Sequence, residues 1–275
     1  MIVIADSGST KCNWQLVDDS GSVRRVQSRG INAVLQRPDE VEALLRETFA
    51  EPVQADALHF YGAGCGERYP EQSARLREAL ARYFPAARIA VESDLMGAAR
   101  ALLGGRAGIA CILGTGSNSC LCRDGEIVCN IPPLGYVLGD EGSGAVLGRN
   151  LLNGIFKGHI PLKEEFLAAH GLNYEEIIRR VYREPYANRF LASFAPFIHA
   201  HTDCVEVREM VRRSFRDFAA RNLSRYPAGL PVSLAGGVAA HFEALLREAL
   251  EAEGYRVETI VESPAEGLLK YHHGA

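Results

Sequence analysis

A short turn of glycine and hydroxyl residues occurs twice in this sequence, each time after an apolar run. Ile2–Ala5 leads into Asp6-Ser7-Gly8-Ser9-Thr10, and a second apolar run from Ile109 leads into Gly114-Thr115-Gly116-Ser117-Asn118. After each turn, apolar and polar residues alternate, as in a strand with one buried face. The sequence therefore predicts two copies of one α/β unit that begins with a β-hairpin, joined near Gly104-Gly105. Gly8 aligns with Gly116, which places Ser9 on Ser117 and Cys12 on Cys120.

The remaining segments alternate between strand and helix patterns, which is typical of α/β folds. One long helical pattern carries an apolar stripe, Val207, Met210, Val211, Phe215 and Phe218, which suits either a buried core or a dimer surface. Strands are expected at 22–29, 58–61, 88–91, 232–235 and 257–261, and helices at 38–49, 71–83, 143–153, 162–169, 174–183, 186–199, 205–226, 240–252 and 265–271.

The composition excludes several classes of protein. With 275 residues, 47% of them hydrophobic and 23% charged, the chain has enough apolar residues for a folded core, unlike a disordered protein. A net charge of −4 argues against nucleic acid as a partner, because such proteins neutralise phosphates with an excess of basic residues. We expect no membrane partner, since no run is long and apolar enough to span a bilayer. The start lacks a secretory signal pattern, and seven cysteines are an odd number, so we expect a cytoplasmic protein with free thiols.

The two glycine turns are candidate phosphate sites. A hairpin tip of Gly and hydroxyl residues presents backbone N–H groups and short donors to phosphate oxygens. Asp6, at the end of the first strand, could hold the magnesium that accompanies a nucleotide. A plain hairpin turn would use the same residue types. The first turn is not a P-loop, because a strand pattern and not a helix follows it.

Three further motifs carry polar or glycine residues at the ends of predicted strands. Asp94 either serves as a general base or, like Ser93, caps the following helix. In Gly139-Asp140-Glu141-Gly142-Ser143, the acidic residues either bind sugar hydroxyls or cap a helix. Gly236-Gly237 either lets a flat base approach the backbone or forms an ordinary tight turn.

These four glycine motifs, in this order, resemble those of the sugar kinase/actin/Hsp70 ATPase superfamily. They are most similar to the N-acetylglucosamine kinase branch of the BadF/BadG/BcrA/BcrD ATPase family, and the resemblance covers nearly the whole chain. It implies an α/β fold of two ribonuclease-H-like, actin-like lobes around a nucleotide cleft. The lobes are expected at residues 1–105 and 106–275, and the final helix could return to the first lobe.

The resemblance also implies a role for each motif residue. Asp6 would act on magnesium, Asp94 would be the catalytic base, and ATP and Mg²⁺ would be the cofactors. ATP would contact the two turns through Gly8, Ser9, Thr10, Lys11, Thr115 and Gly116, and its adenosine would pack on Gly236 and Gly237. The amino sugar would be bound by Asn32, Ser117, Asn118 and Asp140, together with Asp94.

The expected function is an ATP-dependent kinase of an amino sugar: N-acetylglucosamine, glucosamine or N-acetylmuramic acid, most simply at O6. A homodimer is expected. Two alternatives stay open, an ATPase activator of a radical dehydratase or benzoyl-CoA reductase, and a sugar- or nucleotide-sensing protein with little turnover. Thr115 and Asn118 favour the kinase, because the activators tend to carry an acidic Gly-Gly-Gln-Asp-like turn at the second phosphate site.

Overall fold

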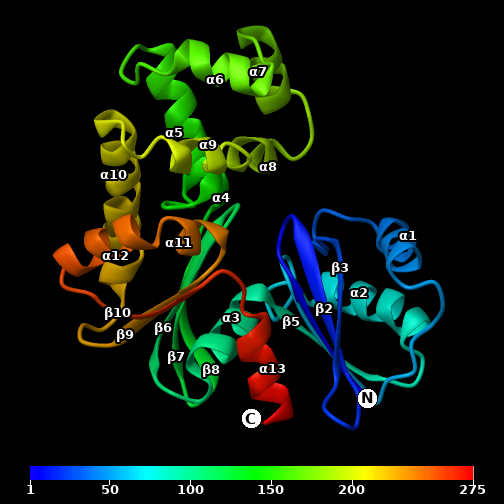
Figure 1. The fold of residues 1–275 in the computed structure, drawn as a ribbon. Helices are drawn as coiled ribbons and strands as arrows, with labels where there is room; N and C mark the ends of the chain where they lie inside the picture. Colours follow the sequence, from blue (N-terminus) through cyan, green and yellow to red (C-terminus); the bar gives the residue numbers. More distant parts are fainter. Residues whose placement is uncertain (275) are drawn as a thin grey trace. The chain divides into compact units, whose positions relative to one another are not determined.

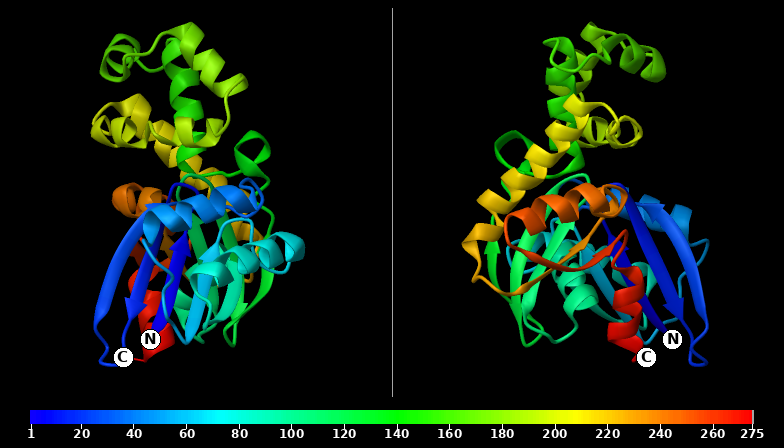
Figure 2. Two further views of the ribbon diagram at one scale, coloured as in Figure 1. Left: turned by 90° about the vertical axis from the view of Figure 1, so that its right-hand side faces the viewer. Right: turned by 60° about the vertical axis from the view of Figure 1, so that its left-hand side comes forward.

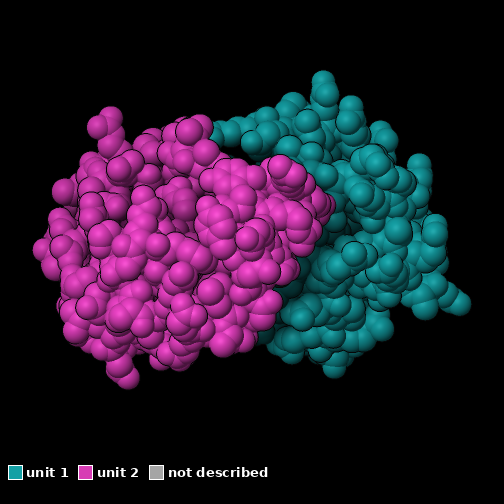
Figure 3. Space-filling model, turned by 90° about the horizontal axis from the view of Figure 1, so that it is seen from above, with its two compact units in different colours: residues 1–106, 123–127, 263–275 teal, residues 107–122, 128–262 magenta. Residues whose placement is uncertain are grey.

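The computed structural model describes residues 1–274, and the chain divides into two compact units, coloured separately in Figure 3. Unit 1 comprises residues 1–106, 123–127 and 263–274. Unit 2 comprises Ala107–Cys122 and Val128–Glu262. The C-terminal segment is therefore part of the same compact unit as the N-terminal strands.

Unit 1 is built on a five-stranded sheet in the order β3-β2-β1-β4-β5 (Figure 1). The first three strands form an antiparallel meander, and β4 and β5 run parallel to β1. The bounds are β1 Ile2–Ser7, β2 Lys11–Val17, β3 Val23–Arg29, β4 Ala57–Gly62 and β5 Arg88–Ser93, which confirms the strands predicted in this half.

Helices cover both faces of this sheet, because successive side chains of a strand point to opposite sides. Val3 and Trp14 face a core shared with α1 (Pro38–Thr48) and α2 (Pro70–Tyr83). Ile4 and Tyr61 face the other side, where Leu268 of α13 (Ala265–His273) and Met96 of α3 (Asp94–Leu103) complete a smaller cluster. Figure 1 shows α13, in red, beside α3.

Unit 2 repeats the topology of unit 1. Its sheet has the order β10-β9-β6-β7-β8, with β6 and β7 antiparallel and β9 and β10 parallel to β6. Each sheet thus starts with an antiparallel hairpin and adds its last two strands in parallel on the far side of its first strand. The predicted internal repeat is confirmed at this level. The bounds are β6 Gly108–Leu113, β7 Ser117–Arg123, β8 Glu126–Ile131, β9 Pro231–Ala235 and β10 Arg256–Val261.

The residue-by-residue alignment of the two repeats was wrong. Gly8 N–H donates to Lys11 O, and the equivalent bond in unit 2 runs from Gly114 N–H to Gly116 O. Gly8 therefore corresponds to Gly114 and not to Gly116. Ser7 pairs with Cys12 across the first turn and Leu113 with Ser117 across the second, so the first turn holds one residue more. Identity of turn residues misled the alignment, because Gly and Ser recur at turns for local reasons.

The other helices belong to unit 2, and Figure 2 shows α5 to α9 beyond one end of the β6–β10 sheet. The prediction of one helix at 186–199 was wrong, because Pro196 lacks the N–H that a continuous helix needs, and α9 begins just before it. The helix predicted at 240–252 is two helices, the first of which begins earlier, at Gly237. The helix predicted at 205–226 ends at Arg221 and is followed by a short 3₁₀ turn. The bounds are α4 Gly135–Leu138, α5 Gly144–Phe156, α6 Lys163–His170, α7 Tyr174–Tyr182, α8 Ala187–Ala192, α9 Ala195–Ala200, α10 Val205–Arg221, the 3₁₀ turn Leu223–Arg225, α11 Gly237–His241 and α12 Glu243–Ala252.

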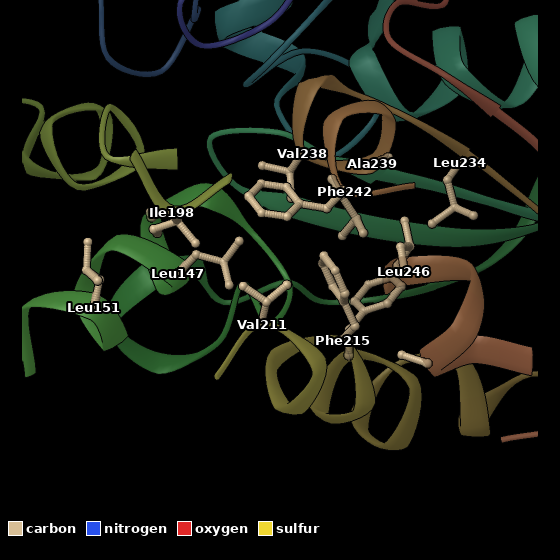
Figure 4. Packing of buried hydrophobic residues seen from close by; sticks show 14 of the residues in the cluster. Leu147, Leu151, Ile198, Val211, Phe215, Leu234, Val238, Ala239, Phe242 and Leu246 are labelled. Atoms are coloured by element: carbon tan, nitrogen blue, oxygen red, sulfur yellow. The ribbon is translucent and has the colours of Figure 1, made fainter. Parts of the chain in front are cut away.

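The apolar stripe of α10 belongs to the core of unit 2. Val207, Val211, Phe215 and Phe218 are completely buried. Figure 4 shows Val211 and Phe215 directed from α10 toward the other labelled core residues. The stripe is therefore not a dimer surface, and it does not support the expectation of a homodimer. Among residues 1–274, no helix has the length and apolar character needed to cross a membrane.

Candidate functional site

In unit 1 the predicted site residues gather at one edge of the sheet. Strands β1, β4 and β5 are mutually parallel, so their carboxyl ends, at Ser7, Gly62 and Ser93, lie at the same edge. Asp6 and the first glycine turn are at the end of β1, and Asp94 follows β5 directly. Ligands of α/β sheets bind at such edges, because the loops that leave the strands meet there.

Gly30 is a residue of this edge that sequence reasoning missed. Its N–H donates to Thr10 O at 2.9 Å, which fastens the end of β3 to the first turn. A Cβ atom at Gly30 would overlap Gly8 O and lie 2.9 Å from the backbone carbon of Ser9. The turn can keep its shape only if residue 30 has no side chain. Only the three-dimensional approach of two backbones makes this visible, since Gly30 is also an ordinary residue for a strand end.

Asp6 is a partly buried carboxylate near the end of β1, the strand that leads into the first glycine turn. Its pKa is raised to about 6, mainly by burial and also by the negative charge of Asp94, while hydrogen bonds from Ser263 and Asn13 oppose the rise. Ser263 Oγ lies 3.2 Å from Asp6 Oδ2. Asp6 and Asp94 repel each other when both are ionised, and a bound cation would relieve this repulsion. Within residues 1–274 no cluster of three or more His, Cys, Asp or Glu side chains could hold a metal by itself. The carboxylates of Asp6 and Asp94 fit Mg²⁺, because proteins usually bind this ion through one or two carboxylates together with substrate phosphates.

Asp94 is the first residue of α3, and its side chain is not the helix cap. Ser93 holds that position, because its hydroxyl accepts a hydrogen bond from Met96 N–H at 3.1 Å. Asp94 Oδ1 accepts from Leu95 N–H at 2.9 Å. Burial raises the pKa of Asp94 to about 6, and the backbone hydrogen bonds only partly offset this rise. A carboxylate of that pKa is ionised at neutral pH and is a stronger base than an exposed aspartate.

Asn32 is held at the same edge. It bridges to Ala63 beyond the end of β4, and Ser7 Oγ both accepts from Ile31 N–H and donates to Ile31 O. Asn32 Oδ1 accepts from Val34 N–H at 3.0 Å in its own turn. Because the oxygen is used there, any contact of Asn32 with a sugar would come from its NH₂ group.

In unit 2 the second glycine turn is bound to the start of α5. Gly144 N–H donates to Gly114 O at 2.8 Å, and Ala145 N–H donates to Thr115 O at 3.1 Å. Ser143 caps this helix by accepting from Val146 N–H at 3.2 Å. These bonds fix the turn by its carbonyl groups.

Asp140 lies directly against this second turn. Its backbone is left-handed, with φ of 55°, a conformation that aspartate tolerates better than most residues. Ser117 N–H points at Asp140 Oδ1 at 3.4 Å, and a Cβ on Gly116 would lie 3.1 Å from Asp140 Oδ2. Burial raises the pKa of Asp140 to about 6, and the Ser117 N–H lowers it.

The alternative in which Asp140 or Glu141 caps α5 was wrong, because Ser143 is the cap. The Glu141 carboxylate instead accepts from Asn222 Nδ2 at 3.3 Å, at the C-terminal end of α10. Of the two acidic residues, Asp140 is therefore the one beside the glycine turn. The motif alone did not show that Asp140 and its neighbour Glu141 have different contacts.

Asn118, the next predicted sugar residue, is oriented by a residue that the sequence did not single out. Asn130 of β8 donates from Nδ2 to Asn118 Oδ1 at 2.9 Å and to Ser119 O at 2.7 Å. The Asn118 oxygen also accepts from Ser119 N–H. As at Asn32, the NH₂ group is the part of Asn118 that would meet a ligand.

Gly236 and Gly237 follow β9, which is parallel to β6, so they lie at the same edge as the second turn. Gly236 has a φ of 123°, and a Cβ there would overlap Leu113 O and approach Gly114 N at 3.2 Å. Gly237 has no such restriction, since the nearest atom to its Cβ position is His241 Nδ1 at 3.9 Å. Gly236 is thus required for packing, whereas Gly237 leaves open space beside the backbone.

Known proteins resemble this chain in sequence and in fold. The sequence matches no protein-family model and no curated protein. A solved structure from Porphyromonas gingivalis, described as a candidate N-acetylglucosamine kinase, is 44% identical, covers 99% of both chains and has a TM-score of 0.93. The chain belongs to this N-acetylglucosamine kinase-like family.

More distant structures share the fold alone. A second candidate N-acetylglucosamine kinase, from Chromobacterium violaceum, is 22% identical over 98% of both chains, with a TM-score of 0.77. A ROK family glucokinase from Streptomyces griseus, solved with glucose and AMPPNP, is 16% identical over 100% of this chain and 98% of that chain, with a TM-score of 0.57. The predicted α/β class, with two actin-like units, is confirmed, and the family is one of sugar kinases.

Proposed function

We propose that this protein is an ATP-dependent kinase that phosphorylates a hydroxyl of an amino sugar, with N-acetylglucosamine as the first acceptor to test. The observation that carries the proposal is the 44% identity to the Porphyromonas gingivalis protein over the whole length of both chains. The chemistry of the two sheet edges supports it, since each edge carries a glycine turn and at least one carboxylate of raised pKa.

Asp94 is the proposed catalytic base. Its carboxylate accepts the proton of the sugar O6 hydroxyl as that oxygen bonds to the γ-phosphorus of ATP. The bond between the γ-phosphorus and the bridging oxygen breaks, and ADP leaves with that oxygen. The Leu95 N–H bond to Oδ1 fixes the carboxylate, so that its orientation is set before the acceptor arrives.

The two glycine turns are the proposed phosphate sites, with Gly8, Ser9, Thr10 and Lys11 in unit 1 and Thr115 and Gly116 in unit 2. Gly236 and Gly237 would contact the adenosine, and at Gly237 no side chain would stand between the backbone and a flat base. Asp6 would hold Mg²⁺, which when bound neutralises charge on the phosphates.

The sugar would be bound by hydrogen bonds from fixed side chains. Asn32 and Asn118 would donate from their NH₂ groups, and Asp140 would accept from a hydroxyl. Ser117 is buried, so its contribution would pass through its N–H bond to Asp140. Side chains that are already held in place discriminate well between sugars, because a sugar that lacks one hydroxyl leaves a polar atom of the site unpaired.

The test is a panel of N-acetylglucosamine, glucosamine and N-acetylmuramic acid with Mg-ATP, in which ADP release and phosphosugar mass are measured together. We expect equal amounts of ADP and phosphosugar, and no product from the 6-deoxy analogue of the preferred sugar. ADP release without phosphosugar would favour the ATPase activator instead. Binding of both ligands without ADP release would favour a sensing protein.

A further inference from the structure

We propose that Ser263 is a positioning residue that fixes the Asp6 carboxylate for a magnesium-bound nucleotide. The inference rests on the proposed function, since it takes Asp6 to be the magnesium ligand. Ser263 follows β10 and lies two residues before α13, in the C-terminal segment of unit 1. It is 257 positions from Asp6 in the sequence.

The hydrogen bonds around Ser263 determine where its proton points. A serine hydroxyl has one proton and two lone pairs. Asn13 Nδ2 lies 3.5 Å from Ser263 Oγ, and Ala265 N–H lies 3.3 Å from the same oxygen. Both groups can only donate, so they use the lone pairs of Oγ. The single proton of Ser263 is then left for Asp6 Oδ2, at 3.2 Å.

Asn13 is itself held in the orientation that this arrangement needs. It lies opposite Asp6 in the antiparallel pairing of β1 and β2. Its Oδ1 accepts from Gln27 Nε2 at 2.9 Å, on the neighbouring strand β3. With the oxygen turned toward Gln27, the two N–H bonds of the NH₂ group are left for Ser263 and for Asp6 itself. All donors therefore point toward Asp6, which accepts from Asn13 and from Ser263.

These hydrogen bonds end on a carboxylate and stabilise its charged form. One oxygen of Asp6 is assigned to Ser263, so the carboxylate is held in one rotamer before a cation binds. Hydrogen bonds of this kind, behind a metal ligand, orient the ligand and commonly change metal affinity by roughly 10–100-fold when they are removed. Nothing in the local sequence around Ser263 indicates this role.

The experiment compares Mg²⁺-dependent ADP binding, by calorimetry, in the wild type and three variants of the full chain. Ser263→Ala removes the donor to Asp6, and Ser263→Thr keeps a hydroxyl. Ser28→Ala is the matched control, because Ser28 Oγ also makes two hydrogen bonds in this sheet, with Trp14 Nε1 and Arg29 O, and none with Asp6. ADP binding without Mg²⁺, and the melting temperature, are measured in parallel.

We expect Ser263→Ala to weaken Mg-ADP binding roughly 10-fold while binding of ADP alone is unchanged, as for loss of a group behind a metal ligand. Ser263→Thr and Ser28→Ala should bind Mg-ADP like the wild type. A purely structural role of Ser263 would lower the melting temperature and weaken ADP binding equally with and without Mg²⁺, which would overturn the inference. Wild-type Mg-ADP affinity in Ser263→Ala, or a Thr variant as weak as the Ala variant, would also overturn it. Failure of the wild type to bind Mg-ADP would instead contradict the proposed function.

Discussion

Replacement of Asp94 by asparagine should abolish most of the catalysis and stabilise the fold at neutral pH. The pKa of Asp94 is raised by burial from 3.8 to about 6. In the unfolded chain the carboxyl loses its proton near its ordinary pKa, whereas the folded chain holds the proton until about pH 6. Folding therefore becomes less favourable as the pH rises between these values, and the full penalty is present above about pH 6.

The size of this penalty follows from the pKa difference. About two pH units, at about 1.4 kcal/mol each, give about 3 kcal/mol at pH 7. Asparagine has nearly the same shape, carries no charge, and keeps an oxygen that can accept from Leu95 N–H. The free energy of unfolding of Asp94→Asn should therefore exceed that of the wild type by up to about 3 kcal/mol at pH 7, and by little near pH 4. Loss of a general base should lower kcat by roughly 10²–10⁴.

The assay is urea unfolding at pH 7 and near pH 4, without nucleotide or Mg²⁺, together with steady-state kinetics on the preferred sugar. Glu67→Gln, which neutralises an exposed carboxylate of unit 1, is the matched control and should change neither quantity. The reasoning is refuted if Asp94→Asn is no more stable than the wild type at pH 7, or if the difference is independent of pH. A near wild-type kcat would remove Asp94 from the reaction.

Three further substitutions test the glycine turns and the sugar loop. Gly30→Ala should cost about 1–3 kcal/mol of stability and raise the KM for ATP, because its Cβ overlaps the first turn. Gly105→Ala is the matched control, because its Cβ would meet no atom within 4 Å. It should change neither the melting temperature nor the KM for ATP. Gly237→Ala should leave the melting temperature unchanged yet raise the KM for ATP; an unchanged KM would mean that no base lies there. Asp140→Ala should raise the KM for the sugar more than it lowers kcat, and the opposite pattern would speak against sugar binding by Asp140.

Most strands and helices, and the repeat of two similar units, were predictable from the sequence, although the helix breaks within 186–199 and 240–252 were missed. Hairpins, helices and strand ends depend on periodic burial and on turn residues, which act over a few neighbouring positions. Because parallel strands end at a common edge, the order of elements also suffices to place Asp6 and Asp94 at one edge of unit 1, whereas Asn32 was expected only from the family resemblance. Those parts of the candidate site were predictable before any coordinates.

The folded structure was needed to show which of two neighbouring polar residues takes a given role. Ser93 and Ser143, rather than the adjacent acidic residues, cap their helices and leave Asp94 and Asp140 for other contacts. The apolar stripe of α10 is buried because other parts of unit 2 pack on it, and its own sequence does not show whether the same chain or a second copy covers it. The contact of Ser263 with Asp6 joins residues at opposite ends of the chain. No local pattern relates such residues, because hydrogen bonds and packing depend on distance in space, and the folded chain alone sets that distance.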